Sequence, residues 1–265
     1  MAACLLHVSD LHTGTREESE VEQALQALVL RVGPELIVAS GDLTNRGTRD
    51  QHERAARFLR TLGPPVLAVP GNHDLPYTFP ARFTRPWAEF ERQWQTTEPT
   101  HTSDAIHVVG LNSVRPYRHQ GGALGSEQLR AAAQRLRAAP EGAYRVAVLH
   151  HHLLGAPWRA ARKRPVSHRS TVLRALVAAG ADLILSGHIH QAALSERREF
   201  EVVEGDRPAA VVASAPGLGQ PRPNRLGEAR GLHVYEPDER SLAVQTYIWR
   251  GGDWALTAQR TFRQN

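Results

Sequence analysis

Cysteine is almost absent from this 265-residue sequence, since Cys4 is the only one. A single cysteine excludes an internal disulfide and any zinc site built from several thiolates, and it fits a reducing compartment such as a bacterial cytoplasm. No apolar run is long enough to cross a bilayer, and the first residues lack the basic start and cleavage-like segment of a secretory signal. We therefore expect a cytoplasmic protein without a membrane span.

Lysine is also scarce, because Lys163 is the only one and arginine supplies nearly all of the positive charge. The formal net charge is +5, but the arginines are scattered along the chain rather than collected in one block. Such a surface attracts phosphate-containing ligands without by itself indicating nucleic-acid binding. Hydrophobic residues make up 41% of the sequence and charged residues 22%, values that suit one globular domain over residues 1–265.

Short apolar runs that end in small, acidic or turn-forming residues recur along the first two thirds of the chain. Residues 5–8, 36–39 and 66–69 have this pattern, which is typical of buried strands, and stretches with helical spacing lie between them. The alternation predicts a mostly parallel sheet flanked by helices, whose ligands collect beyond the carboxyl ends of the strands. It continues to about Gly187, with further strands at 106–111, 146–149 and 183–185 and helices at 127–138 and 171–179.

The pattern changes from Phe200 onward to short β-like runs separated by glycine and proline, which predicts a second sheet. A Gly/Pro-rich segment at 216–227 either borders the site or forms an irregular surface connection. Residues 75–104 form a small insertion with large aromatic residues at helical spacing. This lid-like insertion could cover a substrate or pack onto the domain.

Five short polar motifs follow the ends of the predicted strands. They are Asp10-Leu11-His12, Gly41-Asp42, Gly71-Asn72-His73-Asp74, His150-His151-His152 and Gly187-His188-Ile189-His190. Side chains two residues apart on an extended segment point the same way, so the Asp-x-His and His-x-His pairs are each expected to converge. Carboxylate, imidazole and amide oxygen together suit a first-row divalent metal. Each motif alone is weak evidence because such residues also cap helices and form turns, but ligands at five strand ends favour a metal centre.

The series of motifs from Asp10 to His190 resembles that of the calcineurin-like metallophosphoesterase superfamily. Its spacing, the triple histidine before Leu153 and the segment Gly187-His188-Ile189-His190-Gln191 are similar to the bacterial cyclic-nucleotide (cyclic AMP) phosphodiesterase branch. The resemblance implies an α/β fold, a four-layer αββα sandwich of two mixed sheets flanked by helices. It also implies two divalent or mixed-valence metal ions per chain (Mn, Fe, Zn or Co), with a bridging hydroxide that attacks the phosphate ester.

The resemblance further implies a role for each motif. It assigns Asp10, His12 and His190 to the first metal, Asn72, His188 and one of the triple histidines to the second, and Asp42 to both. His73 would lie near the substrate phosphate and would stabilise the transition state or protonate the leaving oxygen. Asp74 could orient the imidazole of His73.

Which of the three consecutive histidines binds the second metal is ambiguous. Relatives usually place the ligand two residues before a proline, and here Leu153 occupies the position of that proline, which selects His151. If the preceding strand continues through the histidines, alternation sends His151 to one side and His150 with His152 to the other. We therefore predict His151 as the ligand, with His150 as the alternative.

The activity implied by the resemblance is hydrolysis of phosphodiesters, among them cyclic nucleotides such as cAMP or similar small diesters. Phosphomonoesterase, pyrophosphatase and nuclease activities of the same superfamily, and a non-enzymatic scaffold, are the alternatives. The chain has little space for the additional domains of the nuclease relatives, and its full ligand set argues against a scaffold. We expect a small-molecule phosphate ester as the partner and no nucleic acid, and we leave a homodimer open.

Overall fold

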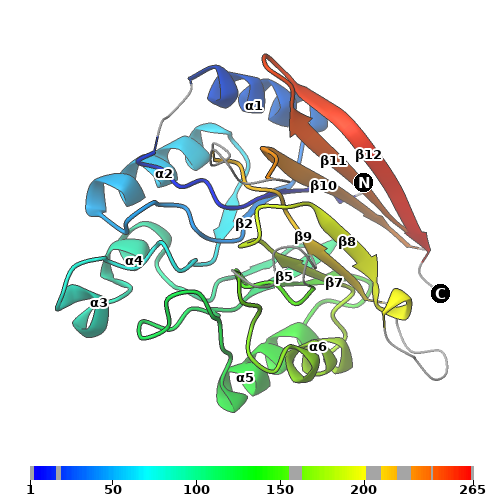
Figure 1. The fold of residues 1–265 in the computed structure, drawn as a ribbon. Helices are drawn as coiled ribbons and strands as arrows, with labels where there is room; N and C mark the ends of the chain where they lie inside the picture. The colour runs from blue at the N-terminus through cyan, green and yellow to red at the C-terminus, as the bar shows by residue number, and fades with distance from the viewer. Residues whose placement is uncertain are drawn as a thin grey trace.

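The apolar runs of the sequence form buried strands in two stacked, six-stranded mixed sheets (Figure 1). The structure, a computed structural model, describes residues 3–15, 19–154, 163–200, 210–219, 228–239 and 241–263. In this part of the chain no helix is both long enough and apolar enough to cross a membrane. The two sheets bring together segments that are far apart in the sequence, and the site forms where their strand ends meet.

The first sheet combines strands from both ends of the chain. Its β1, β2 and β3 run parallel, and β10 pairs antiparallel with β1 so that the C-terminal meander extends the sheet. Every residue of β1 and β2 is buried, which agrees with their continuous apolar sequences. The strands lie in the order β12 (Trp254–Arg263), β11 (Ser241–Trp249), β10 (Gly231–Asp238), β1 (Leu5–Val8), β2 (Leu36–Ala39) and β3 (Val66–Ala68).

The second sheet has a parallel centre and antiparallel edges. Its four central strands are parallel, whereas β4 and β8 run antiparallel at the two edges. A short 3-10 helix, η1 (Arg197–Glu199), follows β8. The strands lie in the order β4 (Thr100–Thr102), β5 (Ile106–Gly110), β6 (Tyr144–Val148), β7 (Leu183–Ser186), β9 (Val211–Ser214) and β8 (Ala193–Glu196).

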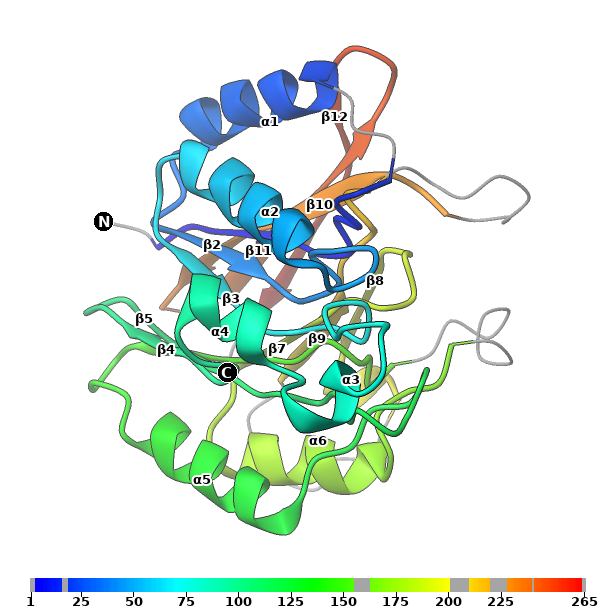
Figure 2. The ribbon, with the colours of Figure 1, turned by 90° about the vertical axis from the view of Figure 1, so that its left-hand side faces the viewer.

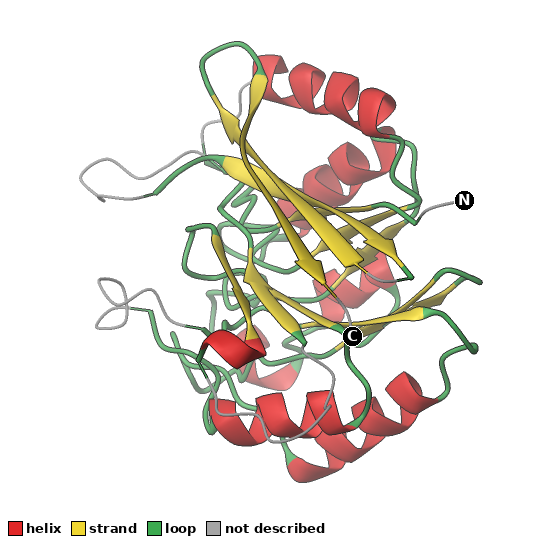
Figure 3. Cartoon of the chain, turned by 90° about the vertical axis from the view of Figure 1, so that its right-hand side faces the viewer, coloured by secondary structure: helices red, strands yellow, loops and turns green. Residues whose placement is uncertain are grey.

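Helices cover the outer face of each sheet and complete four layers (Figures 2 and 3). The first sheet carries α1 (Ser19–Val32) and α2 (Arg49–Thr61), and the second carries α5 (Ser126–Arg137) and α6 (Arg169–Ala178). The hydroxyl of Thr48 accepts a hydrogen bond from the Gln51 amide and so caps the start of α2. The predicted αββα sandwich is confirmed.

Three clusters of buried apolar side chains fill the three spaces between the four layers. Leu25 of α1 belongs to the cluster between the first sheet and its helices, and Val146 of β6 belongs to the cluster between the two sheets. Leu176 of α6 belongs to the cluster between the second sheet and its helices. All three side chains are fully buried. Burial of one such side chain contributes about 1.5–3 kcal/mol, so these clusters hold the strand ends, and therefore the site, in place.

The division of strands between the sheets differs from the sequence prediction. The alternating pattern predicted one parallel sheet up to Gly187, whereas β1–β3 and β5–β7 belong to different sheets. Strands that are buried on both faces have the same apolar pattern in either sheet, so this pattern does not report sheet membership. The β-like pattern predicted from Phe200 onward begins in a segment, residues 201–209, that lies outside the described residues.

The insertion at 75–104 contains α3 (Ala81–Thr84), α4 (Ala88–Trp94) and β4. On α4, Phe90 is fully buried and its ring meets that of His52 on α2 edge-on, at a centroid distance of 6.1 Å. The strand β4 pairs with β5 and so belongs to the second sheet. Much of the insertion is therefore packed onto the domain, and its action as a lid stays a prediction.

Candidate metal centre

The candidate ligands lie in the loops that directly follow β1, β2, β3, β6 and β7. Five of the seven non-glycine residues with positive φ in the described chain belong to this set: Asp10 (52°), His12 (51°), Asp42 (51°), His188 (73°) and His190 (54°). This left-handed backbone differs from the extended conformation that was expected for the Asp-x-His and His-x-His pairs. Left-handed conformations cost free energy for residues with a side chain and concentrate at functional sites, where they aim side chains inward.

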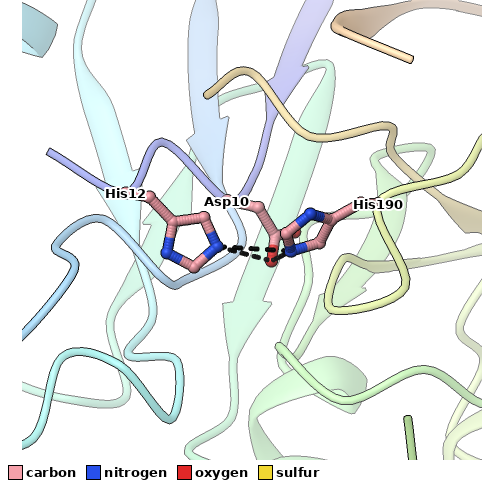
Figure 4. Close-up of side chains that lie close together, drawn as sticks. All are labelled: Asp10, His12 and His190. Atoms are coloured by element: carbon pink, nitrogen blue, oxygen red, sulfur yellow. Dashed lines mark hydrogen bonds and ion pairs between the residues drawn. The ribbon is translucent and has the colours of Figure 1, made fainter. Parts of the chain in front are cut away.

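A first group of ligands consists of Asp10, His12 and His190 (Figure 4). The Nε2 atom of His190 lies 3.0 Å from Asp10 Oδ1 and 3.2 Å from His12 Nε2. The other carboxylate oxygen of Asp10 accepts hydrogen bonds from the hydroxyl of Ser9 and the amide of His188. These bonds fix the carboxylate, so that Oδ1 faces the two imidazoles.

A second group contains Asp42, His150 and His188, with Asn72 beside them. The Nε2 atom of His150 lies 3.4 Å from Asp42 Oδ1, 3.3 Å from Asn72 Oδ1 and 3.2 Å from His188 Nδ1. The other ring nitrogen of His150 donates to the carbonyl of Ser40, at 2.8 Å. In the neutral ring, this bond leaves the lone pair of Nε2 facing the group.

Asp42 connects the two groups. It also forms a third set with His12 and His73, and in each set the possible ligand atoms lie within 4.8 Å of one another. Its Oδ1 accepts a hydrogen bond from the His73 amide, at 2.8 Å, and its Oδ2 lies 3.9 Å from His12 Nε2. Asp42 thus presents its carboxylate to both groups at once.

The electrostatics of the centre require positive charge. Burial alone would raise the pKa of Asp10, yet the neighbouring His190 and His150 lower it overall. Burial would likewise lower the pKa of His150, but the Asp42 carboxylate raises it to about 9. Burial lowers the pKa of His12 to about 3. Two buried, ionised carboxylates are stable only with compensating cations close by.

The donor set fits divalent cations. Asp10 Oδ1 and Asp42 Oδ2, the carboxylate oxygens that face the imidazoles, are buried and have no hydrogen-bond partner among the described residues. Buried polar atoms are almost always paired, so unpaired carboxylate oxygens beside imidazole nitrogens fit the binding of a cation. Oxygen and imidazole nitrogen together suit Mn, Fe, Co or Zn.

The structure brings His150, not the expected His151, into the second group. The strand β6 ends at Val148, so the three histidines lie beyond the strand, and the side-to-side alternation assumed for them does not apply. The Nδ1 atom of His151 pairs with the hydroxyl of Ser113, at 2.9 Å, and its ring packs on His188 at a centroid distance of 4.7 Å. His151 therefore packs on the candidate ligand His188 and lies outside the three candidate sets.

The structure also corrects the expected orienting role of Asp74. The Asp74 carboxylate accepts hydrogen bonds from the amides of Gly71, Leu43 and Thr44, so it ties the loops after β2 and β3 together. The imidazole of His73 is instead oriented by its Nδ1 atom, which donates to the carbonyl of Asn45 at 2.9 Å. The hydroxyl of Tyr77 lies 3.0 Å from the same nitrogen.

Glu228 is a residue of the centre that the sequence motifs missed. Its side chain is 1% exposed, and Oε1 lies 3.6 Å from His190 Nδ1, on the side of the ring opposite to Asp10. Earlier in the chain, the described part of the Gly/Pro-rich segment at 216–227 borders the site, because the Gly219 amide donates to the Asp10 carbonyl. The composition of that segment was the only signal in the sequence. A carboxylate behind a metal-binding imidazole orients the ring.

Comparison with known proteins agrees with this geometry. Residues 5–192 match the calcineurin-like phosphoesterase family. The chain is 30% identical over 225 residues to the 3',5'-cyclic adenosine monophosphate phosphodiesterase CpdA of Haemophilus influenzae, covering 80% of this chain and 78% of that protein. It is also 30% identical to a probable cyclic nucleotide phosphodiesterase of Synechococcus, covering 62% of this chain and 61% of that protein.

A solved structure supports the fold. The purple acid phosphatase PPD1 from yellow lupin (Lupinus luteus) seeds aligns with a TM-score of 0.73 at 11% identity, covering 98% of this chain and 53% of that one. This likeness concerns the fold alone. The family match and the curated relatives identify a metal-dependent phosphoester hydrolase, as the motifs predicted. The chain belongs to the calcineurin-like phosphoesterase family.

Proposed function

We propose that this chain hydrolyses phosphodiesters, with 3',5'-cyclic nucleotides such as cAMP as the substrate class, at a centre of two divalent cations. The observation that carries the proposal is the pair of buried ligand groups that the Asp42 carboxylate connects, with Oδ1 3.4 Å from His150 Nε2 and Oδ2 3.9 Å from His12 Nε2. The substrate class is supported by two relatives, a cyclic AMP phosphodiesterase and a probable cyclic nucleotide phosphodiesterase.

The proposed ligand set follows the two groups. Asp10, His12 and His190 would hold one cation, Asn72, His150 and His188 would hold the other, and Asp42 would serve both. When bound, two divalent cations would polarise the phosphoryl oxygens and lower the pKa of water, which supplies hydroxide at neutral pH. Which of Mn, Fe, Zn or Co occupies the centre is left to metal analysis.

His73 is the residue proposed to act on the substrate without binding metal. Its amide is held by Asp42 and its Nδ1 by the Asn45 carbonyl, so the ring position is fixed from two sides. The ring meets that of His12 edge-on, at a centroid distance of 4.8 Å, which places it beside the first ligand group. With Nδ1 protonated, Nε2 can carry a second proton to the leaving oxygen.

A substrate panel tests the proposal. The Mn-loaded protein should hydrolyse cAMP with a kcat/KM at least about tenfold higher than that for 5'-AMP, the matching monoester. The Asp42→Ala variant, which loses the shared ligand, should hydrolyse neither. A preference for 5'-AMP would indicate a phosphomonoesterase instead, and full cAMP hydrolysis by Asp42→Ala would reject the shared centre.

A further inference from the structure

A second feature of the molecule, which we call the basic pocket, lies between the segments 117–121 and 164–171. It encloses about 1190 Å³, enough for a phosphorylated nucleoside. Three arginines line it, Arg118, Arg164 and Arg169, together with two histidines. None of its described lining residues is an aspartate or glutamate. The metal-centre mechanism uses none of these groups.

The wall of the basic pocket is attached to the triple-histidine segment. The amide of Val166 in this wall donates to the His152 carbonyl, at 3.2 Å. The adjoining Gly122 lies so close to His151 that an added Cβ would be 2.5 Å from the ring. The His151 ring in turn packs on that of the proposed ligand His188. The basic pocket is therefore separated from the second ligand group by only one or two side chains.

The arginines of the basic pocket have the arrangement of an anion site. Arg118 donates through Nη1 to the Ser167 hydroxyl, at 2.7 Å, which fixes one guanidinium at the wall. Arg164 and Arg169 are exposed, and in the described part of the chain neither forms an ion pair with a carboxylate. Like charges gathered without a counter-ion repel each other, and a bound anion removes that cost. Guanidinium groups match the geometry of phosphate in particular.

His152 gives a further link between the basic pocket and the centre. Both nitrogens of its ring are buried without a hydrogen-bond partner among the described residues, and the ring stacks on His188 at a centroid distance of 5.7 Å. The ring of His152 therefore lies between the wall of the basic pocket and the proposed ligand His188.

We propose that the basic pocket is a substrate subsite that binds a second phosphate group, one carried by the same nucleotide whose diester lies at the metal centre. Within the proposed class of nucleotide phosphodiesters, a substrate that carries an additional phosphate would then bind more tightly than the same diester without it. This inference rests on the proposed phosphodiesterase function.

Two chromogenic substrates with the same leaving group test the subsite. They are the p-nitrophenyl ester of thymidine 5'-phosphate and the same compound with a 3'-phosphate. In the native protein, the extra phosphate should lower KM by about tenfold with kcat nearly unchanged, the size expected for a charge-assisted contact. The double variant Arg164→Gln, Arg169→Gln should lose this difference. Arg174→Gln should keep this difference in KM. Arg174 is exposed on α6, the helix that begins with Arg169, but it does not line the pocket.

The outcomes separate the subsite from the proposed function. Hydrolysis of both esters with equal KM would overturn the subsite and leave the phosphodiesterase activity standing. If Arg174→Gln lost the difference in KM to the same extent as the double variant, the subsite would be overturned as well. Such a result would show that the positive charge of the surface attracts the extra phosphate without a specific site. If the native protein hydrolyses neither ester, the proposed function is judged by the hydrolysis of cAMP and fails if that is absent too. The subsite is then judged by binding of thymidine 3',5'-bisphosphate, which the double variant should lose and Arg174→Gln should keep; equal binding by all three proteins would overturn it.

Discussion

At the scale of single residues, three identical side chains in a row have three different environments. His150 faces a carboxylate and an amide oxygen, His151 pairs with Ser113, and the ring of His152 has no hydrogen-bond partner among the described residues. The chemistry of each imidazole is therefore decided by the loop that presents it. The alignment with the family proline selected His151, and the assumption of an extended strand placed His150 on the opposite side. Neither argument takes account of the backbone conformation after β6.

The histidines provide a matched pair of variants. We expect His150→Ala to lose about one of two metal ions per chain and nearly all activity, since it removes a ligand atom from the second group. His151→Ala should keep both ions, because its ring supports His188 without belonging to a ligand set. Metal analysis of the purified variants, with circular dichroism as the check on folding, decides between them. Loss of metal from His151→Ala alone would return the assignment to that residue.

At the scale of elements, the centre depends on a close approach between the ends of β7 and β1. Gly187 directly follows β7, and a Cβ at this position would lie 1.8 Å from the Ser9 hydroxyl and 2.7 Å from Asp10 Oδ2. The gap between the two loops is too small for any side chain, so this position requires glycine. The same oxygen of Asp10 accepts the bonds that fix the first ligand group.

Gly187→Ala should therefore displace the Asp10 carboxylate and reduce metal affinity and activity together. The expected loss of stability is about 1–3 kcal/mol, the usual cost of overpacking a filled interior. Gly125→Ala is the control, because an added Cβ there has no neighbour within 4 Å. Isothermal titration with Mn²⁺ and urea unfolding measure both effects. Native metal affinity in Gly187→Ala would show that the approach of the loops is not needed.

Most elements of the fold could be predicted because their patterns are local. The bounds predicted for β1 and β2 agree with the structure, since buried apolar runs end where polar ligands begin. The long strand β12 was not predicted, because most of its side chains are exposed and its sequence does not alternate clearly. Glu228 could not be assigned either, as its position beside His190 depends on long-range packing.

At the scale of the whole molecule, a buried histidine connects the two sheets. His233 lies on β10 of the first sheet, and its Nε2 donates to the carbonyl of Ser214 on β9 of the second, at 3.1 Å. Its Nδ1 accepts from the hydroxyl of Thr246, at 3.0 Å. Burial lowers the pKa of His233 to about 4 from its ordinary value of 6.5, so the ring is neutral in the folded protein.

Stability should depend on pH through this residue. Between about pH 6.5 and pH 4 the unfolded chain binds the proton and the folded chain does not, so the stabilisation is complete above pH 6.5 and is lost as the pH falls. Urea unfolding of the metal-free protein should show a smaller decrease over this interval for His233→Gln than for the native chain. His119→Gln, an exposed control, should behave like the native chain. Equal pH dependence in all three would reject the role of His233.

The two sheets bring their strand ends together at the candidate metal centre, and we propose that this centre holds two cations. Titration of the chelator-treated protein with Mn²⁺, while cAMP hydrolysis is followed, tests it most directly. We expect no hydrolysis without metal and a rate that rises until two equivalents per chain are bound, because the ligands form two groups that Asp42 connects. Full activity in the metal-free protein, or a rate that saturates at one equivalent, would contradict this account.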